Sequence, residues 1–227
     1  MLDLSVFNDL SLFANEIWIA RYALLRGLGV TLSISALAIV AGSVLGVGVA
    51  LGLVYGPRVV RATIRVYVDI VRGTPVLVLV LASYYIFSTV GLDLGPFQAG
   101  VLALAVFCSS HVGEIVRGAL QAIPPGQTEA AKAIGLTFGQ TFSSVLWPQA
   151  LRQILPTWVN TAAEMVKAST LLSVIGVAEL LLRTQEIISR NFLSLHFYFL
   201  AGFLYFLINF GIERLGKYVE RKTAVPS

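Results

Sequence analysis

The chain has 227 residues, of which 57% are hydrophobic and only 12% carry a charge. An ordinary soluble domain carries about 25% charged residues, so this balance indicates a protein whose main solvent is lipid. The net charge of +4 does not indicate nucleic-acid binding, because that function needs Lys and Arg clustered on a soluble surface. Apolar runs recur along the chain without a Ser- or Pro-rich linker, which predicts a single domain over residues 1–227.

The first 20 residues carry acidic charges, Asp3, Asp9 and Glu16, ahead of Arg21. A cleavable signal peptide would begin with a basic region and end at a small-residue cleavage site, so we expect this segment to be retained. Its apolar residues fall at helical spacing. They predict a short helix that lies at the membrane interface, with Trp18 at the depth of the lipid headgroups.

Five segments are long and apolar enough to span a membrane. A bilayer core about 30 Å thick requires roughly 20 apolar residues of helix, because unpaired backbone polar groups are very costly in hydrocarbon. The predicted spans are approximately residues 30–54, 66–90, 97–117, 154–178 and 195–213. We therefore predict an all-α integral membrane fold with five transmembrane helices.

Small residues are the main packing signal within these spans. The first span holds Gly42, Gly46, Gly48 and Gly52, at spacings that allow a neighbouring helix to approach closely. That neighbour can belong to the same chain or to a second subunit, and the spacing does not decide between them. The single cysteine, Cys108, cannot form an intrachain disulfide, and within an apolar run we interpret it as a small core residue.

The distribution of Lys and Arg predicts the orientation in the membrane, because short cytoplasmic loops keep the positive excess. Arg21, Arg26, Arg183 and Arg190 lie on one side. The other side carries Arg58, Arg61, Arg65, Arg72, Arg117, Lys132, Arg152, Arg214, Lys217, Arg221 and Lys222. This split fits an odd number of spans, with the N-terminus outside and the C-terminus in the cytoplasm.

Two pairs of ionisable residues fall near the ends of the second and third spans, where such groups are costly unless they are compensated. Asp69 and Arg72 are three residues apart, which predicts an ion pair with a structural role. His111 and Glu114 have no second histidine or carboxylate at ligand spacing, so we expect hydrogen bonding near the helix end and no metal site.

The polar loop between the third and fourth spans has a helical pattern of its own. Thr128 is the predicted N-cap, Glu129 then lies at the positive end of the helix dipole, and Gly135 closes the segment. The result is a cytoplasmic helix of about two turns, which needs packing to be stable. Its small alanine face, which includes Ala130 and Ala131, suits insertion into a groove on a partner protein.

The spacing within this loop, over residues 124–148, resembles a known family. Glu129-Ala130-Ala131, Gly135 and then Val145-Leu146-Trp147-Pro148 resemble the EAA loop of permease subunits in binding-protein-dependent ABC importers. Further blocks are similar to the polar amino acid subfamily of these permeases. They are Arg72–Pro75, Glu114–Arg117, Ile123–Gln127, Pro148–Arg152 and Ser173–Leu180.

The resemblance implies a transport subunit that is not an enzyme and that sits in the bacterial cytoplasmic membrane. It implies pairing with an identical or homologous permease, an extracytoplasmic binding protein that delivers a polar amino acid, and two cytoplasmic ATPase subunits. Those subunits would dock on Glu129, Ala130, Ala131 and Gly135. The chain has no GxxxxGK motif followed by Ser or Thr, so ATP and Mg²⁺ are expected on the partner, with no cofactor in this chain.

Two other functional classes compete with this interpretation. A self-contained channel or secondary transporter is the alternative, although a secondary transporter usually has more spans and an internal repeat. A membrane-bound enzyme would need a cluster of nucleophile, base or metal ligands, which the sequence does not suggest.

The fourth span carries the residues that we predict for the substrate pathway. Glu164 and Lys167 lie near its middle, with Asn160 and Thr161 one turn earlier. Glu164 and Lys167 are three residues apart, so they could form a structural ion pair with each other. Alternatively, they could offer a carboxylate and a cation to a zwitterionic amino acid in transit. The sequence leaves both interpretations open.

Overall fold

The structure is a computed structural model, and it describes residues 4–89, 91 and 93–223. All regular elements of these residues are helical. The α-helices are α1 (Leu4–Tyr55), α2 (Arg58–Gly73), α3 (Val76–Thr89), α4 (Pro96–Ala122), α5 (Pro125–Ala133), α6 (Phe138–Thr141), α7 (Trp147–Ala168), α8 (Leu180–Asn191) and α9 (Ser194–Thr223). A π-helical turn (Phe142–Leu146) precedes α7, and a 3₁₀ segment (Ser169–Ile175) follows it.

Three helices are long and apolar enough to cross a membrane: Ser11–Tyr55 of α1, Pro96–Ala122 and Ser194–Lys222 of α9. Two bent pairs pass the same test when each is taken as one span, which raises the number to five within the described residues. The predicted all-helical membrane fold is confirmed, and the five predicted spans correspond to this upper number.

The second predicted span is not one straight helix. It is divided between α2 and α3, which meet at a bend of 110°. Pro75 lies at the break, and Thr74 before it is extended, with φ −100° and ψ 132°. A residue that precedes proline is pushed out of the helical region by steric contact with the proline ring. The fourth predicted span, residues 154–178, covers most of α7 and the 3₁₀ segment, and the chain then bends by 52° into α8.

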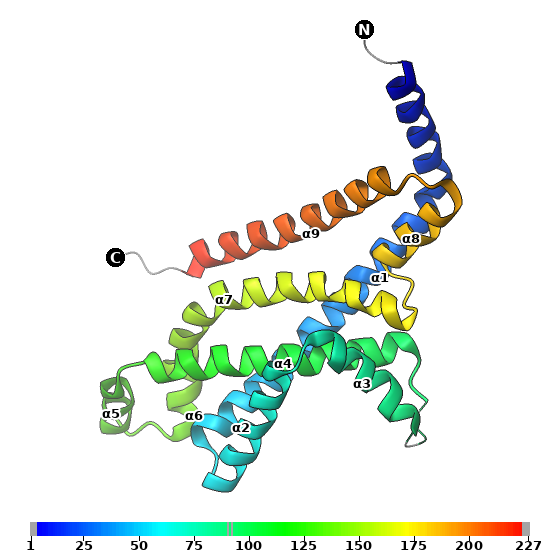
Figure 1. The fold of residues 1–227 in the computed structure, drawn as a ribbon. Coiled ribbons are helices and arrows are strands. Elements are labelled where there is room, and N and C mark those ends of the chain that lie inside the picture. The colour runs from blue at the N-terminus through cyan, green and yellow to red at the C-terminus, as the bar shows by residue number, and fades with distance from the viewer. Residues whose placement is uncertain (1–3, 90, 92, 224–227) are drawn as a thin grey trace.

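The N-terminal segment differs from the separate interfacial helix that we predicted. Its described residues are the first turns of α1, which continues without a break to Tyr55. Figure 1 shows these turns projecting beyond the other helices. Trp18 is exposed, and the guanidinium carbon of Arg21 lies 3.9 Å from the centroid of its ring. Met1–Asp3, which belong to the same predicted helix, lie outside the described residues.

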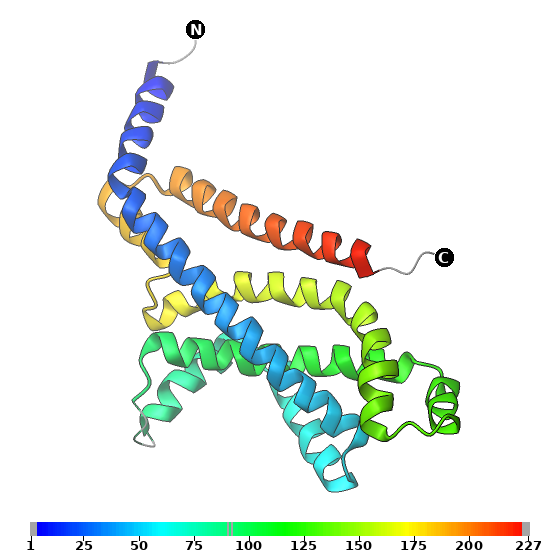
Figure 2. The ribbon, with the colours of Figure 1, turned by 180° about the vertical axis from the view of Figure 1, so that it is seen from behind.

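The core forms where α1 crosses α4, as Figure 2 shows from behind. A Cβ added at Gly42 would lie 2.5 Å from the Cβ of Cys108, and one added at Gly46 would lie 2.7 Å from the Cβ of Val112. Gly42 and Gly46 therefore allow close packing within the chain. The sequence had left open whether the neighbouring helix belongs to this chain or to a second subunit. Cys108 is buried, as predicted.

The helices α7 and α9 run antiparallel beside each other, with α4 on the other side of α7 (Figures 1 and 2). They pack closely at Gly216, where an added Cβ would lie 2.5 Å from a methyl carbon of Val159. Glycine at this position lets the two helices approach so closely. This arrangement places the polar residues of α7 beside the C-terminal half of α9.

Candidate translocation and coupling sites

The predicted coupling helix is α5, and it begins three residues before the predicted N-cap Thr128. Its N-cap is Pro124 and its first residue is Pro125, so the prediction of Thr128 was wrong. Proline is favoured at the first position of a helix, because its φ is already helical and its missing N–H would have no partner there. The helix therefore starts within the Pro124-Pro125-Gly126 segment.

The C-terminal end of α5 explains why the loop needs a glycine at position 135. Gly135 has φ +81°, a left-handed conformation that other residues rarely adopt. Its N–H donates to the carbonyl of Lys132 at 2.9 Å, and the N–H of Leu136 donates to the carbonyl of Ala131 at 3.0 Å. This is the Schellman arrangement, which ends a helix and pairs its last carbonyls.

The predicted docking residues divide between the surface and the interior. Glu129 and Ala130 are exposed, whereas Ala131 is buried against the rest of the chain. The most exposed apolar residues of this region are Ile134, at 76%, and Phe138, at 62%. Neither residue was predicted from the sequence, although an apolar residue on each side of Gly135 in an otherwise polar loop was a usable signal.

A cluster of charges joins α2 to α4. Glu114 receives two hydrogen bonds from Arg117, at 2.7 and 3.1 Å, and one from Arg65 at 3.1 Å, while Arg72 lies 3.9 Å away. The predicted pairing of Asp69 with Arg72 is wrong, because Arg72 turns towards Glu114 on α4. His111 forms its hydrogen bond within α4, where its Nδ1 lies 3.1 Å from the carbonyl oxygen of Phe107. We define the Glu114 cluster as Glu114 with Arg65, Arg72 and Arg117.

The exposed side of α7 is polar along its length. Asn160, Glu164 and Lys167 are all exposed, and their spacing of three and four residues puts them on one face of the helix. Thr161 is turned away and buried, with its hydroxyl donating to the carbonyl of Thr157. Two further exposed residues extend the same face. The α7 stripe therefore comprises Gln153, Thr157, Asn160, Glu164 and Lys167.

The structural ion pair that the sequence allowed between Glu164 and Lys167 does not form. In the part of the chain that the structure describes, neither residue belongs to an ion pair with an N···O distance within 4 Å. Asn160 also lines a cavity of about 260 Å³ between α7 and α9, which the sequence did not suggest. Glu213 and Lys217 of α9 line the opposite wall of this cavity.

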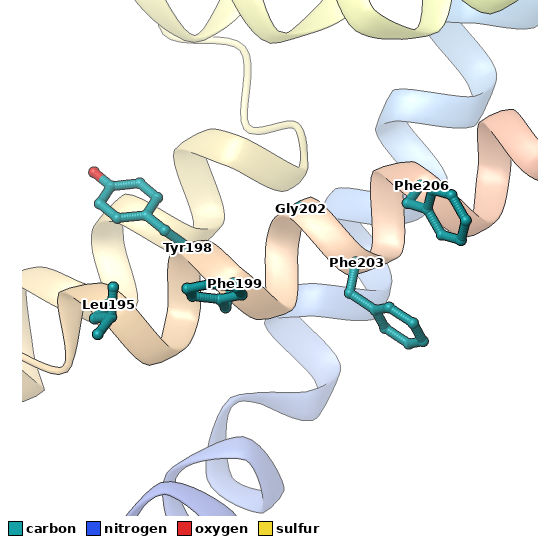
Figure 3. A pocket seen from close by; sticks show the side chains of 6 residues that line it. All are labelled: Leu195, Tyr198, Phe199, Gly202, Phe203 and Phe206. Carbon is teal, nitrogen blue, oxygen red and sulfur yellow. The ribbon is translucent and has the colours of Figure 1, made fainter.

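The outer side of α9 is apolar, whereas the exposed side of α7 is polar. We define the α9 face by the residues that line one open groove on this helix: Leu195, Tyr198, Phe199, Gly202, Phe203 and Phe206. Figure 3 shows the rings of Phe203 and Phe206 projecting from the helix. Phe203 is 56% exposed and Phe199 is 73% exposed, so the chain itself covers little of this surface.

A buried carboxylate connects the N-terminal half of α9 to α8 and α1. Glu179 caps α8 by accepting from the N–H of Leu182 at 2.8 Å, and the hydroxyls of Thr31 and Tyr205 also donate to it. The side chain is fully buried. The sequence analysis noted Glu179 only within a motif. A capping role was not predictable from the residue type, because Ser, Thr, Asp and Asn are the residues preferred at this position.

Comparisons with known proteins bear on this architecture. Residues 38–225 match the family described as "Binding-protein-dependent transport system inner membrane component". The L-cystine transport system permease protein of Bacillus subtilis (strain 168) is 34% identical over 86% of this chain and 84% of its own length. The glutamine transport system permease protein of Escherichia coli (strain K12) is 33% identical over 93% of this chain and 97% of its own length.

Solved structures agree with these sequence relatives. The crystal structure of an amino acid ABC transporter with histidines is 33% identical, with a TM-score of 0.82 over 91% of this chain and 97% of that one. An inward-facing MetNI methionine ABC transporter shares the fold, with a TM-score of 0.77 at 23% identity over 90% and 97% of the two chains. The family implies ATPase and binding-protein partners. The chain therefore belongs to the binding-protein-dependent ABC importer permeases of the polar amino acid type, as a multi-pass transport subunit of the bacterial inner membrane rather than an enzyme.

Proposed function

We propose that this permease pairs with an identical or homologous subunit, and that the α7 stripe lines the path along which a polar amino acid crosses the membrane. The relatives named for glutamine and L-cystine support the class of cargo. The family match over residues 38–225 supports one permease domain for residues 1–227. The observation that carries the proposal is that Glu164 and Lys167 are exposed on a helix of the membrane region and form no ion pair with any described residue.

The cost of charge in lipid supports this placement of the stripe. A charged residue at the centre of a membrane helix costs about 2.5–3.5 kcal/mol on insertion scales, and such residues usually face a bundle interior or a water-filled cavity. Glu164 and Lys167 lack an ion-pair partner among the described residues. A water-filled path between two subunits removes the penalty for both residues, and it offers both charges to a zwitterion.

The coupling proposal concerns the loop that contains α5. We assign ATPase docking to Glu129, Ala130, Ala131 and Gly135, with separate roles. Glu129 and Ala130 contact the partner, Ala131 supports the helix from inside, and Gly135 sets the conformation that ends it. The exposed side chains of Ile134 and Phe138 enter an apolar groove on the ATPase. ATP and Mg²⁺ are held by two such ATPase subunits, and the extracytoplasmic binding protein delivers the amino acid.

We further propose that the N-terminus lies outside and the C-terminus in the cytoplasm. The excess of Lys and Arg around α2, α5 and the end of α9 supports this orientation. In a Cys108→Ser background, cysteines at the exposed positions Asp93 and Ser189 should react with an impermeant maleimide in sealed right-side-out vesicles, and a cysteine at Lys132 should not. Labelling at position 132 would contradict the orientation.

Substitution of Glu164 tests the pathway. Glu164→Gln removes the charge and keeps the shape, so we expect a stable complex whose uptake of cationic amino acids falls relative to that of neutral ones. Competition uptake in proteoliposomes, with Arg, Lys, His, Gln and Glu as competitors, measures the rank order. Asp69→Asn is the matched control, because Asp69 is an exposed carboxylate on another helix. An unaltered rank order in Glu164→Gln would remove Glu164 from the path.

A further inference from the structure

Four arginines lie on one face of α2, directly after the first span ends at Tyr55. They are Arg58, Arg61, Arg65 and Arg72, at intervals of three, four and seven residues. With 3.6 residues in each turn, these intervals return to the same side of the helix. We call this side the arginine face. It begins next to the coupling loop, because the ring of Tyr55 packs edge-on against Phe138 at 5.1 Å between centroids.

The chain compensates only part of this positive charge. Glu114 forms ion pairs with Arg65, Arg72 and Arg117, so one carboxylate is shared by three guanidinium groups. The side chains of Arg65 and Arg72 remain 43% and 46% exposed. Arg58 and Arg61 are exposed and belong to none of the ion pairs of the described residues. Arg61 donates instead to the carbonyl of Gly56 at 3.3 Å. Asp69 is also exposed on this side of α2, about two turns from Arg61. The arginines outnumber the carboxylates, so the surplus of positive charge is largest at the N-terminal end of α2, at Arg58 and Arg61.

An apolar strip runs along α2 beside the arginine face. Val59 is 77% exposed, Val66 58% and Ile70 60%, at intervals of seven and four residues. At 100° for each residue, the centre of this strip lies about a third of a turn from the centre of the arginine face. The helix buries another side, with Val68 and Val71, against the remaining chain. Cations beside an exposed apolar strip are typical of a helix at the boundary between headgroups and acyl chains.

We propose that α2 binds an anionic phospholipid from the leaflet on the side of the coupling loop. The lipid phosphate is held by Arg58 and Arg61, and its acyl chains lie along Val59, Val66 and Ile70. Groups of four or more basic residues on an amphipathic helix next to a membrane span are a recognised pattern for anionic lipid. An anionic lipid covers both the arginine face, with its phosphate, and the apolar strip, with its acyl chains. An acidic protein surface would match the arginines and leave the apolar strip uncovered. This site is independent of the α7 path.

Lipid binding to the intact permease–ATPase complex tests the proposal. Native mass spectrometry would count phosphatidylglycerol and phosphatidylcholine bound during titration of the detergent-purified complex. We expect Arg58→Gln/Arg61→Gln to weaken phosphatidylglycerol binding about 30-fold, since each basic residue contributes about fivefold near a membrane surface. Binding of phosphatidylcholine should not change. Both arginines are exposed and outside the Glu114 cluster, so the fold should persist.

Two control variants make the result specific. Arg58→Lys/Arg61→Lys keeps the charge and should keep most of the phosphatidylglycerol affinity. Arg221→Gln/Lys222→Gln removes the same charge from the end of α9 and should leave the affinity as in the parent. Parent-like affinity in Arg58→Gln/Arg61→Gln, or an equal loss in the α9 variant, would overturn the site. Loss of the ATPase subunit from the Arg58→Gln/Arg61→Gln complex without added lipid would assign this face to a protein partner and also overturn it.

Discussion

The neighbouring helices α7 and α9 present opposite kinds of surface. The α7 stripe is polar, with Glu164 and Lys167 free of ion pairs within the described residues, whereas the α9 face is built from aromatic and aliphatic side chains. Both surfaces are exposed in the single chain. Exposure alone therefore does not separate a surface that needs water from one that needs an apolar cover, and the chemistry of the exposed side chains makes that distinction.

The two helices are also held differently. On α7, the indole N–H of Trp158 donates to the hydroxyl of Ser43 on α1 at 2.8 Å. On α9, the contact with α7 depends on close packing at Gly216, and the N-terminal half of the helix is held by Tyr205, which donates to Glu179. The hydrogen bond of Trp158 and the close packing at Gly216 should respond differently to substitution, so the comparison of the two helices can be tested.

The largest expected effect comes from placing a cation on each surface. Phe203→Lys should reduce the amount of folded permease in the membrane severely, because a lysine in apolar surroundings at the centre of a helix costs about 2.5–3.5 kcal/mol. Thr157→Lys, on the α7 stripe, should accumulate to near the parent level. Fluorescence-detected size exclusion of solubilised membranes measures both. Equal accumulation would mean that the two surfaces meet the same surroundings.

An intermediate effect is expected at the contact between the helices. Gly216→Ala introduces a methyl group against Val159, and overpacking of this kind typically costs about 1–3 kcal/mol. For a chain of this size, Tm should fall by about 2–4 °C for each kcal/mol.

Gly202→Ala is the matched control for the Gly216 substitution. It lies on the same helix, and an added Cβ there meets nothing within 4 Å. We expect the control to keep the parent Tm in a thermal-shift measurement of the purified complex, and Val159→Ala to restore part of the loss in Gly216→Ala. A parent-like Tm for Gly216→Ala would show that α9 is not held at this point.

The smallest effect concerns the bond that anchors α7. Trp158→Phe removes the donor to Ser43 and keeps most of the ring, so we expect a loss of about 0.5–1.5 kcal/mol, the net value of one hydrogen bond. A double-mutant cycle with Ser43→Ala should recover a coupling energy of that size from the thermal-shift data. Strictly additive effects would indicate that the bond contributes nothing to the position of α7.

Local features of the sequence predicted much of this protein. Long apolar runs predicted the helices, since a backbone in hydrocarbon must satisfy its own hydrogen bonds. The spacing of the EAA loop predicted a helix that ends before Gly135, and the structure adds the reason, a φ of +81°. Cys108 was predicted as a core residue and is buried. Each of these depends on composition or on neighbours a few residues away.

The tertiary structure alone decided which distant residues meet. Arg72 could have paired with Asp69 on its own helix, but α4 brings Glu114 within reach together with Arg65 and Arg117. The glycines of the first span could have served a second subunit, and Gly42 and Gly46 instead pack on α4. Helical periodicity determines which residues share a face. The packing of one helix on another determines which face is buried, because that choice depends on the shapes and charges of segments far apart in the chain.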